Sequence, residues 1–212
     1  MKYLFFDIDG TLIDEYHKLP LSTKKTLKQL KENGHFIAIA TSRPHVLTYK
    51  LARDLHIDNF VCDGGDGIII DNEIKELLAL NLEDCLKVAK ECLMHDIPIA
   101  TSIDTTNNRY SIDGKFIELN GYLKDAFDFV TKVDFDIFKA IVIHKMCLHI
   151  TSDEEHLVPS LNKVPHYRIS PTCILVEAID KYKGIKKMVK YLNGNLEDVI
   201  VFGDGLNKTL IV

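Results

Sequence analysis

Three short and nearly continuous apolar runs stand out in the pattern of hydrophobic and polar positions. They are KYLFF (2–6), HFIAIA (35–40) and DVIVF (198–202). Runs of this length, rich in β-branched and aromatic residues, are typical of strands that are buried on both faces of a parallel sheet. The pattern therefore predicts three strands of one buried sheet.

A helix is predicted between the first two strands, over residues 21–34. Ser22 is expected as its N-cap, and Gly34 as the residue that ends it. A strand, a helix and a second strand in this order predict a right-handed parallel βαβ unit. A second helix is expected over residues 183–194, before the third strand, with one apolar face. That face consists of Ile185, Met188, Val189 and Leu192.

The middle of the chain has a different pattern, in which helices and strands do not alternate regularly. Helices are expected at 81–96 and 114–130, a helical turn at 152–161, and strands at 97–103, 136–144, 166–170 and 173–179. This order predicts an α+β domain inserted into an α/β core. We assign residues 1–81 and 180–212 to the core and residues 82–179 to the inserted domain.

Composition narrows the range of functions. The formal net charge of −5 argues against a dedicated nucleic-acid-binding protein. No apolar run is long enough to span a bilayer, so we expect no membrane segment. The five cysteines include no CxxC pair. An odd number of scattered cysteines is typical of reduced thiols in a cytoplasmic protein.

The sharpest chemical signal is FFDIDGTL, at the end of the first predicted strand. Asp7 and Asp9 are two positions apart, and Gly10 allows the backbone to turn tightly after them. Two close carboxylates repel each other unless a cation or a shared proton intervenes, and Mg²⁺ is a suitable cation. One carboxylate could act as a nucleophile and the other could transfer a proton. The alternative is an ordinary aspartate turn that ends a strand.

All three predicted strands end in small polar residues. Asp7 follows the first strand, Thr41 the second, and Gly203 with Asp204 the third. Ligands of open α/β sheets bind outside the carboxyl ends of the strands. Small polar residues also begin ordinary loops, but their occurrence after three strands favours a shared site.

Four segments, in this order, resemble the motifs of the haloacid dehalogenase (HAD) phosphohydrolase superfamily. They are Asp7-Ile8-Asp9-Gly10-Thr11, Thr41-Ser42-Arg43-Pro44, Lys183-Gly184 and Gly203-Asp204-Gly205-Leu206-Asn207. Their spacing is similar to that of the Cof-type branch (subclass IIB), in which a large cap lies between the second and third motifs. The resemblance implies a Rossmann-like parallel-sheet core with an inserted α+β cap domain.

The resemblance also implies a role for each matching residue. Asp7 would be the nucleophile that forms an aspartyl-phosphate, and Asp9 the general acid and base. Thr41 would bind the transferring phosphoryl group, and Lys183 would pair with the nucleophile. The residues that would contact the phosphate are Gly10, Ser42, Arg43 and Asn207. The Mg²⁺ ligands would be the Asp7 carboxylate, the Asp9 backbone carbonyl and Asp204.

Two further stretches contain residue types that often bind phosphate. Several lysines between residues 181 and 190 fit the solvated face of a helix. Lys183 is distinguished from them by the resemblance and by its place near the start of that helix, where backbone N–H groups favour anions. The glycine-rich CDGGDGIII (62–70) lacks the Lys-Ser/Thr of a P-loop. In the family, a glycine-containing turn that leads to the cap occupies this place.

The sequence departs from the family after the fourth motif. Lys208 stands where a second aspartate is usual, and the given sequence ends at Val212, which predicts a core that is incomplete at its C-terminus. Two hypotheses of different classes follow. The first is a Mg²⁺-dependent phosphatase of small phosphorylated metabolites, with sugar phosphates as the expected class. The second is a catalytically impaired relative that at most binds phosphate ligands or a partner. A phosphomutase would share every motif, and the sequence leaves the oligomeric state open.

Overall fold

The computed structural model describes residues 1–14, 16, 18–122 and 129–204 of the 212-residue chain. The chain forms two compact units. Unit 1 comprises residues 1–77 and 179–212, and unit 2 comprises residues 78–178. The division falls at 77/78 and 178/179, where the sequence pattern placed it at 81/82 and 179/180. Each unit is described by itself below.

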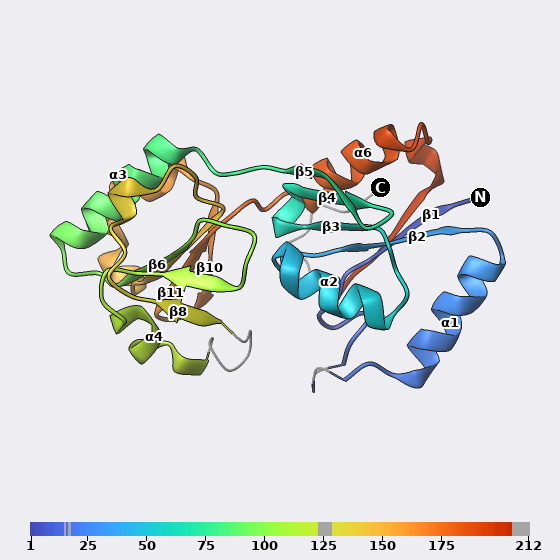
Figure 1. Ribbon diagram of the computed structural model, residues 1–212, viewed down its shortest axis with the longest axis horizontal. Helices are drawn as coiled ribbons and strands as arrows, with labels where there is room; N and C mark the ends of the chain where they lie inside the picture. Colours follow the sequence, from blue (N-terminus) through green and yellow to red (C-terminus); the bar gives the residue numbers. More distant parts are fainter. Residues whose placement is uncertain (15, 17, 123–128, 205–212) are drawn as a thin grey trace. The chain divides into compact units, whose positions relative to one another are not determined.

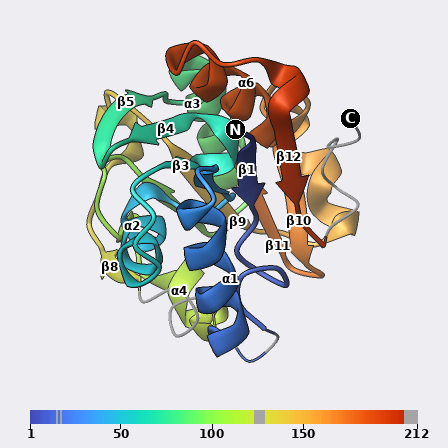
Figure 2. The same ribbon diagram turned by 90° about the vertical axis from the view of Figure 1, so that its right-hand side faces the viewer.

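Unit 1 is built around a six-stranded sheet with the order β12-β1-β2-β3-β4-β5. The four strands from β12 to β3 run parallel, and β4 and β5 are added antiparallel. Figure 2 shows β1 and β12 as neighbouring arrows that point the same way. The strands are β1 (Tyr3–Phe6), β2 (Phe36–Ala40), β3 (Phe60–Cys62), β4 (Gly67–Ile70), β5 (Glu73–Leu77) and β12 (Val199–Phe202).

Helices cover both faces of this sheet, which explains the continuous apolar runs of its strands. Leu4 and Phe6 of β1 pack with α1 and α2 on one face, while Tyr3 and Phe5 pack with α6 on the other. The helical elements are α1 (Leu21–Glu32), α2 (His45–Asp54), the 3-10 turn η1 (Asp63–Gly65), α6 (Lys181–Tyr191) and the 3-10 turn η5 (Leu196–Asp198).

The predicted ends of α1 are partly wrong. The helix begins at Leu21 with Pro20 as its N-cap, and no side chain caps it, so Ser22 lies inside the first turn. Proline already has the extended conformation that an N-cap requires, and its missing N–H is not needed there. Gly34 ends the helix as predicted, with φ +78°, and the N–H of His35 reaches back to the carbonyl of Leu30.

Unit 2 contains a second six-stranded sheet, of order β10-β11-β9-β6-β7-β8, with its main apolar core on one face. Figure 1 shows it as the green to orange part of the chain. Its strands are β6 (Ile99–Ser102), β7 (Asn108–Tyr110), β8 (Val130–Lys132), β9 (Lys145–His149), β10 (His166–Ser170) and β11 (Cys173–Val176). Its helical elements are α3 (Leu82–Met94), α4 (Lys115–Leu119), η2 (Ile137–Lys139), η3 (Ser152–Leu157) and η4 (Pro159–Lys163).

One predicted strand of unit 2 is wrong. Residues 136–144 form the η2 turn and an irregular segment, and the strand lies instead at β9. Ile137, Ala140 and Ile143 are buried, but Ile141 is 90% exposed. This spacing of buried positions does not match the alternation of a strand. The expected helix at 114–130 begins as α4, and part of it, residues 123–128, lies outside the described residues.

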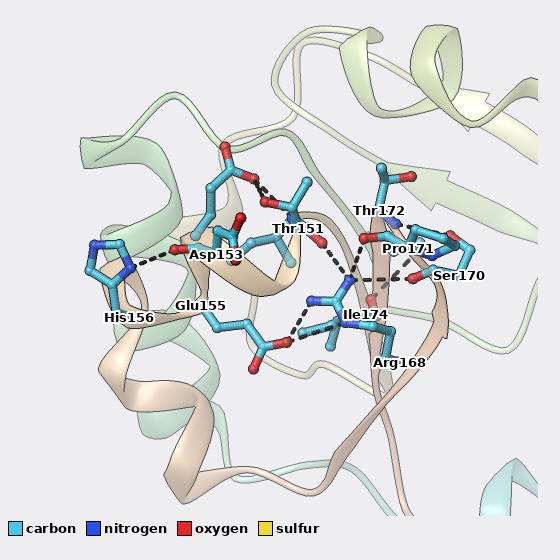
Figure 3. Close-up of polar contacts among 12 residues, drawn as sticks. Thr151, Asp153, Glu155, His156, Arg168, Ser170, Pro171, Thr172 and Ile174 are labelled. Atoms are coloured by element: carbon cyan, nitrogen blue, oxygen red, sulfur yellow. Dashed lines mark hydrogen bonds and ion pairs between the residues drawn. The ribbon is translucent and has the colours of Figure 1, made fainter.

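Arg168 of β10 fixes the tight turn between β10 and β11 (Figure 3). Its Nη1 donates to the carbonyl oxygens of Ile150 at 2.7 Å, Pro171 at 2.9 Å and Ser170 at 3.3 Å. Its Nη2 and Nε both donate to Oε1 of Glu155 in η3, at 2.5 and 3.2 Å. One guanidinium thus satisfies three backbone carbonyls and one carboxylate, so the hairpin and η3 are held as one piece.

No helix of the described residues is long and apolar enough to cross a membrane. All five cysteines are described, and each is buried.

Candidate functional site

The carboxyl end of β1 lies in the middle of the parallel part of the sheet and carries Asp7. The N–H of Asp7 donates to the carbonyl of Phe202 in β12 at 2.9 Å. Its Oδ1 accepts the N–H of Ile8 at 2.9 Å, and the residue is only 6% exposed. The parallel ladders with β2 and β12 bring the ends of all three strands to the same edge. A buried carboxylate at this edge needs a counter-charge.

Lys181 supplies that counter-charge. Its Nζ lies 2.9 Å from Oδ1 of Asp7, and both side chains are 8% exposed. Lys181 is the first residue of α6, and Asp180 is the N-cap, accepting the N–H of Lys183 at 2.9 Å. The capped helix start therefore places a lysine ammonium directly against the carboxylate at the end of β1.

The prediction that Lys183 pairs with Asp7 is wrong in this structure. The Nζ of Lys183 lies 3.5 Å from Oδ1 of Asp66, and its side chain is half exposed. The Lys-Gly pair was interpreted as the start of the helix, but α6 begins two residues earlier. The apolar periodicity carried the missing signal, since its buried positions follow i, i+3, i+4, i+7 and i+8. These positions are Lys181, Gly184, Ile185, Met188 and Val189.

Asp9 is held by an arginine. Nε of Arg43 donates to Oδ2 of Asp9 at 3.0 Å, and Nη2 to Oδ1 at 2.5 Å. This bidentate pair is the strongest geometry that arginine and a carboxylate adopt. The Asp9 side chain is about half exposed and Arg43 is mostly covered. Sequence reasoning placed both residues in the site but did not anticipate that they would bind each other.

Thr41 directly follows β2 and is almost fully buried. Its N–H donates to the carbonyl of Val61, and its Oγ1 accepts the N–H of Arg43 at 3.1 Å. This hydroxyl thus also fixes the backbone that carries the arginine. Ser42 lies between them in a bend and is partly exposed.

Gly10 leaves room for the carboxylate of Asp204. Its φ is +73°, a conformation that glycine adopts without strain. A Cβ atom at this position would overlap Asp204, lying 2.7 Å from its Cγ. Gly203 also approaches Asp7, since a Cβ built on it would lie 3.7 Å from the Asp7 Cβ. The end of β12 and the turn after β1 therefore lie against each other.

The donor set at this edge suits a hard divalent cation. Asp7 and Asp204 offer carboxylate oxygens, and backbone carbonyls are also available in the turn after β1. Among the described residues, no three His, Cys, Asp or Glu side chains are grouped to hold a metal. The expected set, with two carboxylates and one carbonyl, does not require three such side chains. Asn207 and Lys208 lie outside the described residues.

Burial and electrostatics also affect the loop beside the site. Burial lowers the pKa of His45, the first residue of α2, and the nearby Asp63 carboxylate opposes this effect. The His45 ring also stacks on Phe60 of β3. The lowered pKa favours the neutral form of the imidazole.

Comparison with known proteins agrees with this geometry. The model of the haloacid dehalogenase-like hydrolase family (Hydrolase_3) matches residues 4–208. A Bacillus subtilis protein named as a candidate phosphatase, YkrA, is 30% identical over 97% of this chain and 80% of its own length.

Two solved structures share the fold of the whole described chain. A crystal structure of a protein of unassigned function from Geobacillus kaustophilus HTA426 has a TM-score of 0.85 and 27% identity, covering 97% of this chain and 81% of that one. The HAD subclass IIB sugar phosphatase BT4131 has a TM-score of 0.77 and 28% identity, covering 98% and 82%. An aspartate pair at the end of β1, a buried lysine from α6 and a match along nearly the whole chain lead to one assignment. The chain belongs to the haloacid dehalogenase-like hydrolase family, as an enzyme of its phosphatase class.

Proposed function

We propose that this protein is a Mg²⁺-dependent phosphohydrolase that releases phosphate from small phosphorylated metabolites through an aspartyl-phosphate intermediate. The observation that carries the proposal is the buried ion pair between Asp7 and Lys181. Asp9, the second carboxylate, follows Asp7 by two residues. A carboxylate held rigidly at a strand end, with a cation beside it and a second carboxylate within reach, is what phosphoryl transfer requires. The sugar phosphatase named above supports sugar phosphates as the substrate class.

In the first step, a carboxylate oxygen of Asp7 forms a bond to phosphorus while the bond from phosphorus to the substrate oxygen breaks. The leaving alkoxide takes a proton from Asp9, which enters this step as the carboxylic acid and leaves it as the carboxylate, so an alcohol departs. In the second step, a water oxygen bonds to phosphorus, its proton passes to Asp9, and the aspartyl-phosphate bond breaks. Inorganic phosphate leaves, and both aspartates return to their initial state.

Several groups are proposed to bind the phosphate. The Thr41 hydroxyl and the cation of Lys181 would contact the phosphoryl oxygens. Lys181 thus takes the role that the sequence suggested for Lys183. The backbone around Gly10 and Ser42, the Arg43 guanidinium and Asn207 are the remaining proposed contacts. Positioning and charge neutralisation by such groups supply most of the rate enhancement in phosphoryl transfer.

Mg²⁺ is the proposed cofactor. The Asp7 carboxylate, the Asp9 backbone carbonyl and the Asp204 carboxylate would hold it. The space that Gly10 leaves for Asp204 supports this set. When bound, the ion would neutralise charge on the phosphoryl oxygens.

Unit 2 is the proposed cap of the enzyme. It is inserted between β5 and α6, and it has its own sheet and core. We assign it the exclusion of water during the reaction and the selection of the substrate. The five buried cysteines, which include no CxxC pair, support a reducing, cytoplasmic location.

Phosphate release from p-nitrophenyl phosphate and a set of sugar phosphates, with Mg²⁺ and with EDTA, tests the proposal. Mg²⁺-dependent release that disappears in Asp7→Asn is expected. A folded protein that releases no more phosphate than Asp7→Asn contradicts it. Conversion of a sugar phosphate to its isomer without free phosphate would indicate a phosphomutase instead.

A further inference from the structure

The glycine-rich turn η1 follows β3 and has no role in the chemistry proposed above. Its three residues, Asp63, Gly64 and Gly65, all have positive φ. Three consecutive residues of this kind form an unusual local backbone. The turn contacts the starts of both α2 and α6, the segments next to the two cations of the site.

Asp63 binds the segment that carries Arg43. Its N–H donates to the carbonyl of Arg43 at 3.0 Å, and its Oδ2 accepts the N–H of His45 at 3.0 Å. The N-cap of α2 is Pro44, which has no capping side chain of its own. Asp63 therefore caps α2 from the turn that follows β3 and fixes the residue that holds Asp9.

Gly65 binds the start of α6. Its φ is +113°, and a Cβ atom on it would overlap the backbone carbonyl of Asp180, the N-cap residue before Lys181. Gly184 of α6 also lies close to the turn, since a Cβ atom on it would lie 2.7 Å from the carbonyl oxygen of Gly65. Neither contact leaves room for a side chain, so the helix start lies directly on the turn.

The left-handed backbone of Asp63, with φ +48°, adds a further observation. Such a conformation in a residue other than glycine persists where the surrounding structure determines it. Here two hydrogen bonds hold Asp63 in place, one that its backbone N–H donates and one that its side chain accepts. Asn and Asp tolerate this conformation better than most residues, which explains an aspartate at this position.

We propose that η1 is the positioning element of the site, which sets Arg43 against Asp9 through α2 and Lys181 against Asp7 through α6. Asp63 acts through Arg43 and is a positioning residue that does not touch the substrate. The inference rests on the proposed phosphatase reaction for its kinetic readout. It assigns the CDGGDG segment a role that its lack of a P-loop lysine left open.

Three substitutions of Asp63 separate the role of its side-chain acceptor from that of its left-handed backbone. Asp63→Asn keeps an oxygen acceptor and the tolerated backbone, Asp63→Gly keeps the backbone and removes the acceptor, and Asp63→Ala loses both. We expect kcat/KM near the wild-type value for Asp63→Asn, and a fall of about tenfold for Asp63→Gly, because small misplacements of catalytic groups are costly. Asp63→Ala should lose at least as much.

The decisive comparison repeats Asp63→Gly in an Arg43→Ala background. If Asp63 acts through Arg43, the second substitution should lower kcat/KM less than twofold there. A further tenfold fall would overturn the inference, because it would show an effect that does not pass through Arg43.

Gly65→Ala tests the other half of the turn, with Gly34→Ala as its control. Both residues have positive φ, but a Cβ at Gly34 meets nothing within 4 Å. Only Gly65→Ala should lower kcat/KM, by about tenfold or more. Equal losses in both variants would attribute the effect to backbone strain and would contradict the inference.

A readout without turnover separates this inference from the proposed function. The Nε–H resonance of Arg43, identified by its loss in Arg43→Ala, should be resolved in the wild-type protein and in Asp63→Asn. In Asp63→Gly it should broaden or move to the position of a solvent-exposed arginine. An inactive wild-type protein with this pattern refutes the phosphatase proposal alone, whereas an unchanged resonance in Asp63→Gly refutes the positioning role.

Discussion

Replacement of Lys181 by methionine gives the strongest test of how the site is built. The pair with Asp7 has one short contact, 2.9 Å between Nζ and Oδ1, and both side chains are nearly buried. At this distance the attraction is about 6 kcal/mol if the effective dielectric constant is roughly 20. Much of it is offset by the cost of removing both charges from water, so the net value is far smaller.

Removal of one partner leaves the other charge buried and alone. Lys181→Met should therefore lower the free energy of unfolding by about 3 kcal/mol. Asp7→Asn should cost somewhat less, because the amide oxygen still accepts a hydrogen bond. The double variant contains a neutral pair, so its loss should be smaller than the sum of the two single losses by about 2 kcal/mol.

Lys183→Met is the matched control. It makes the same chemical change on the same helix, but the Lys183 side chain is half exposed and its pair with Asp66 is long. Surface substitutions of this kind change stability by about 0.5 kcal/mol or less. Lys181→Met should also lower phosphate release by at least about a hundredfold, while Lys183→Met should leave it nearly unchanged.

Urea denaturation in EDTA, followed by far-ultraviolet circular dichroism, measures these losses, since the chain has no tryptophan. Two compact units can unfold separately, so two transitions should be fitted. The transition that shifts in Lys181→Met should then be compared in the wild type and all four variants. Losses that add within about 0.5 kcal/mol would refute the coupling of Asp7 and Lys181. An equal loss in Lys183→Met would refute the assignment of the lysine.

Three further predictions follow from single features. Gly10→Ala should abolish the Mg²⁺-induced rise in melting temperature. Gly34→Ala should retain it, because Gly34 has a similar φ but a Cβ there meets nothing within 4 Å. Equal Mg²⁺ effects in both variants would argue against the Asp204 site. Because burial lowers the pKa of His45, the unfolded chain binds its proton first as the pH falls below about 6.5, and stability falls with it; the decrease in melting temperature from pH 7 to pH 5 should be smaller in His45→Gln. Burial raises the pKa of three thiols, those of Cys85, Cys92 and Cys173, to about 12. At pH 8 these thiols should therefore react with Ellman's reagent only after the protein unfolds. Rapid reaction of the native protein would contradict their burial.

Local patterns in the sequence predicted much of unit 1. Strands buried on both faces give continuous apolar runs, and this explains why β1, β2 and β12 were found. Gly34 was identified as a helix end because few other residues adopt its φ without strain. Asp7 and Asp9 were identified because both carboxylates lie within three consecutive residues at the end of one predicted strand. In each case the signal lies within a few residues of sequence.

Contacts between distant segments were not predicted. The pair of Arg43 with Asp9 joins residues 34 positions apart, and that of Lys181 with Asp7 joins residues 174 apart. Lys181 could still have been identified, because it lies in phase with the buried face of α6. The strand at β9 was missed for another reason. The apolar segment before it is anchored by buried side chains but does not form a strand. Composition alone does not distinguish such a segment from a buried strand.

The charges that the structure brings together also bear on the need for a metal. At the ends of β1, β2 and β12 the described residues supply three carboxylates, Asp7, Asp9 and Asp204, and two cations, Arg43 and Lys181. With Asp9 ionised, as in its pair with Arg43, three negative charges and two positive charges leave a net charge of −1, which would repel a phosphate dianion. A divalent cation reverses the sign to +1 and makes the same edge attractive to the proposed substrate. Both cations are already paired with aspartates, so they offset those carboxylates and leave no excess of positive charge at this edge. This balance gives a physical reason for the Mg²⁺ dependence of the proposed reaction that does not depend on any relative.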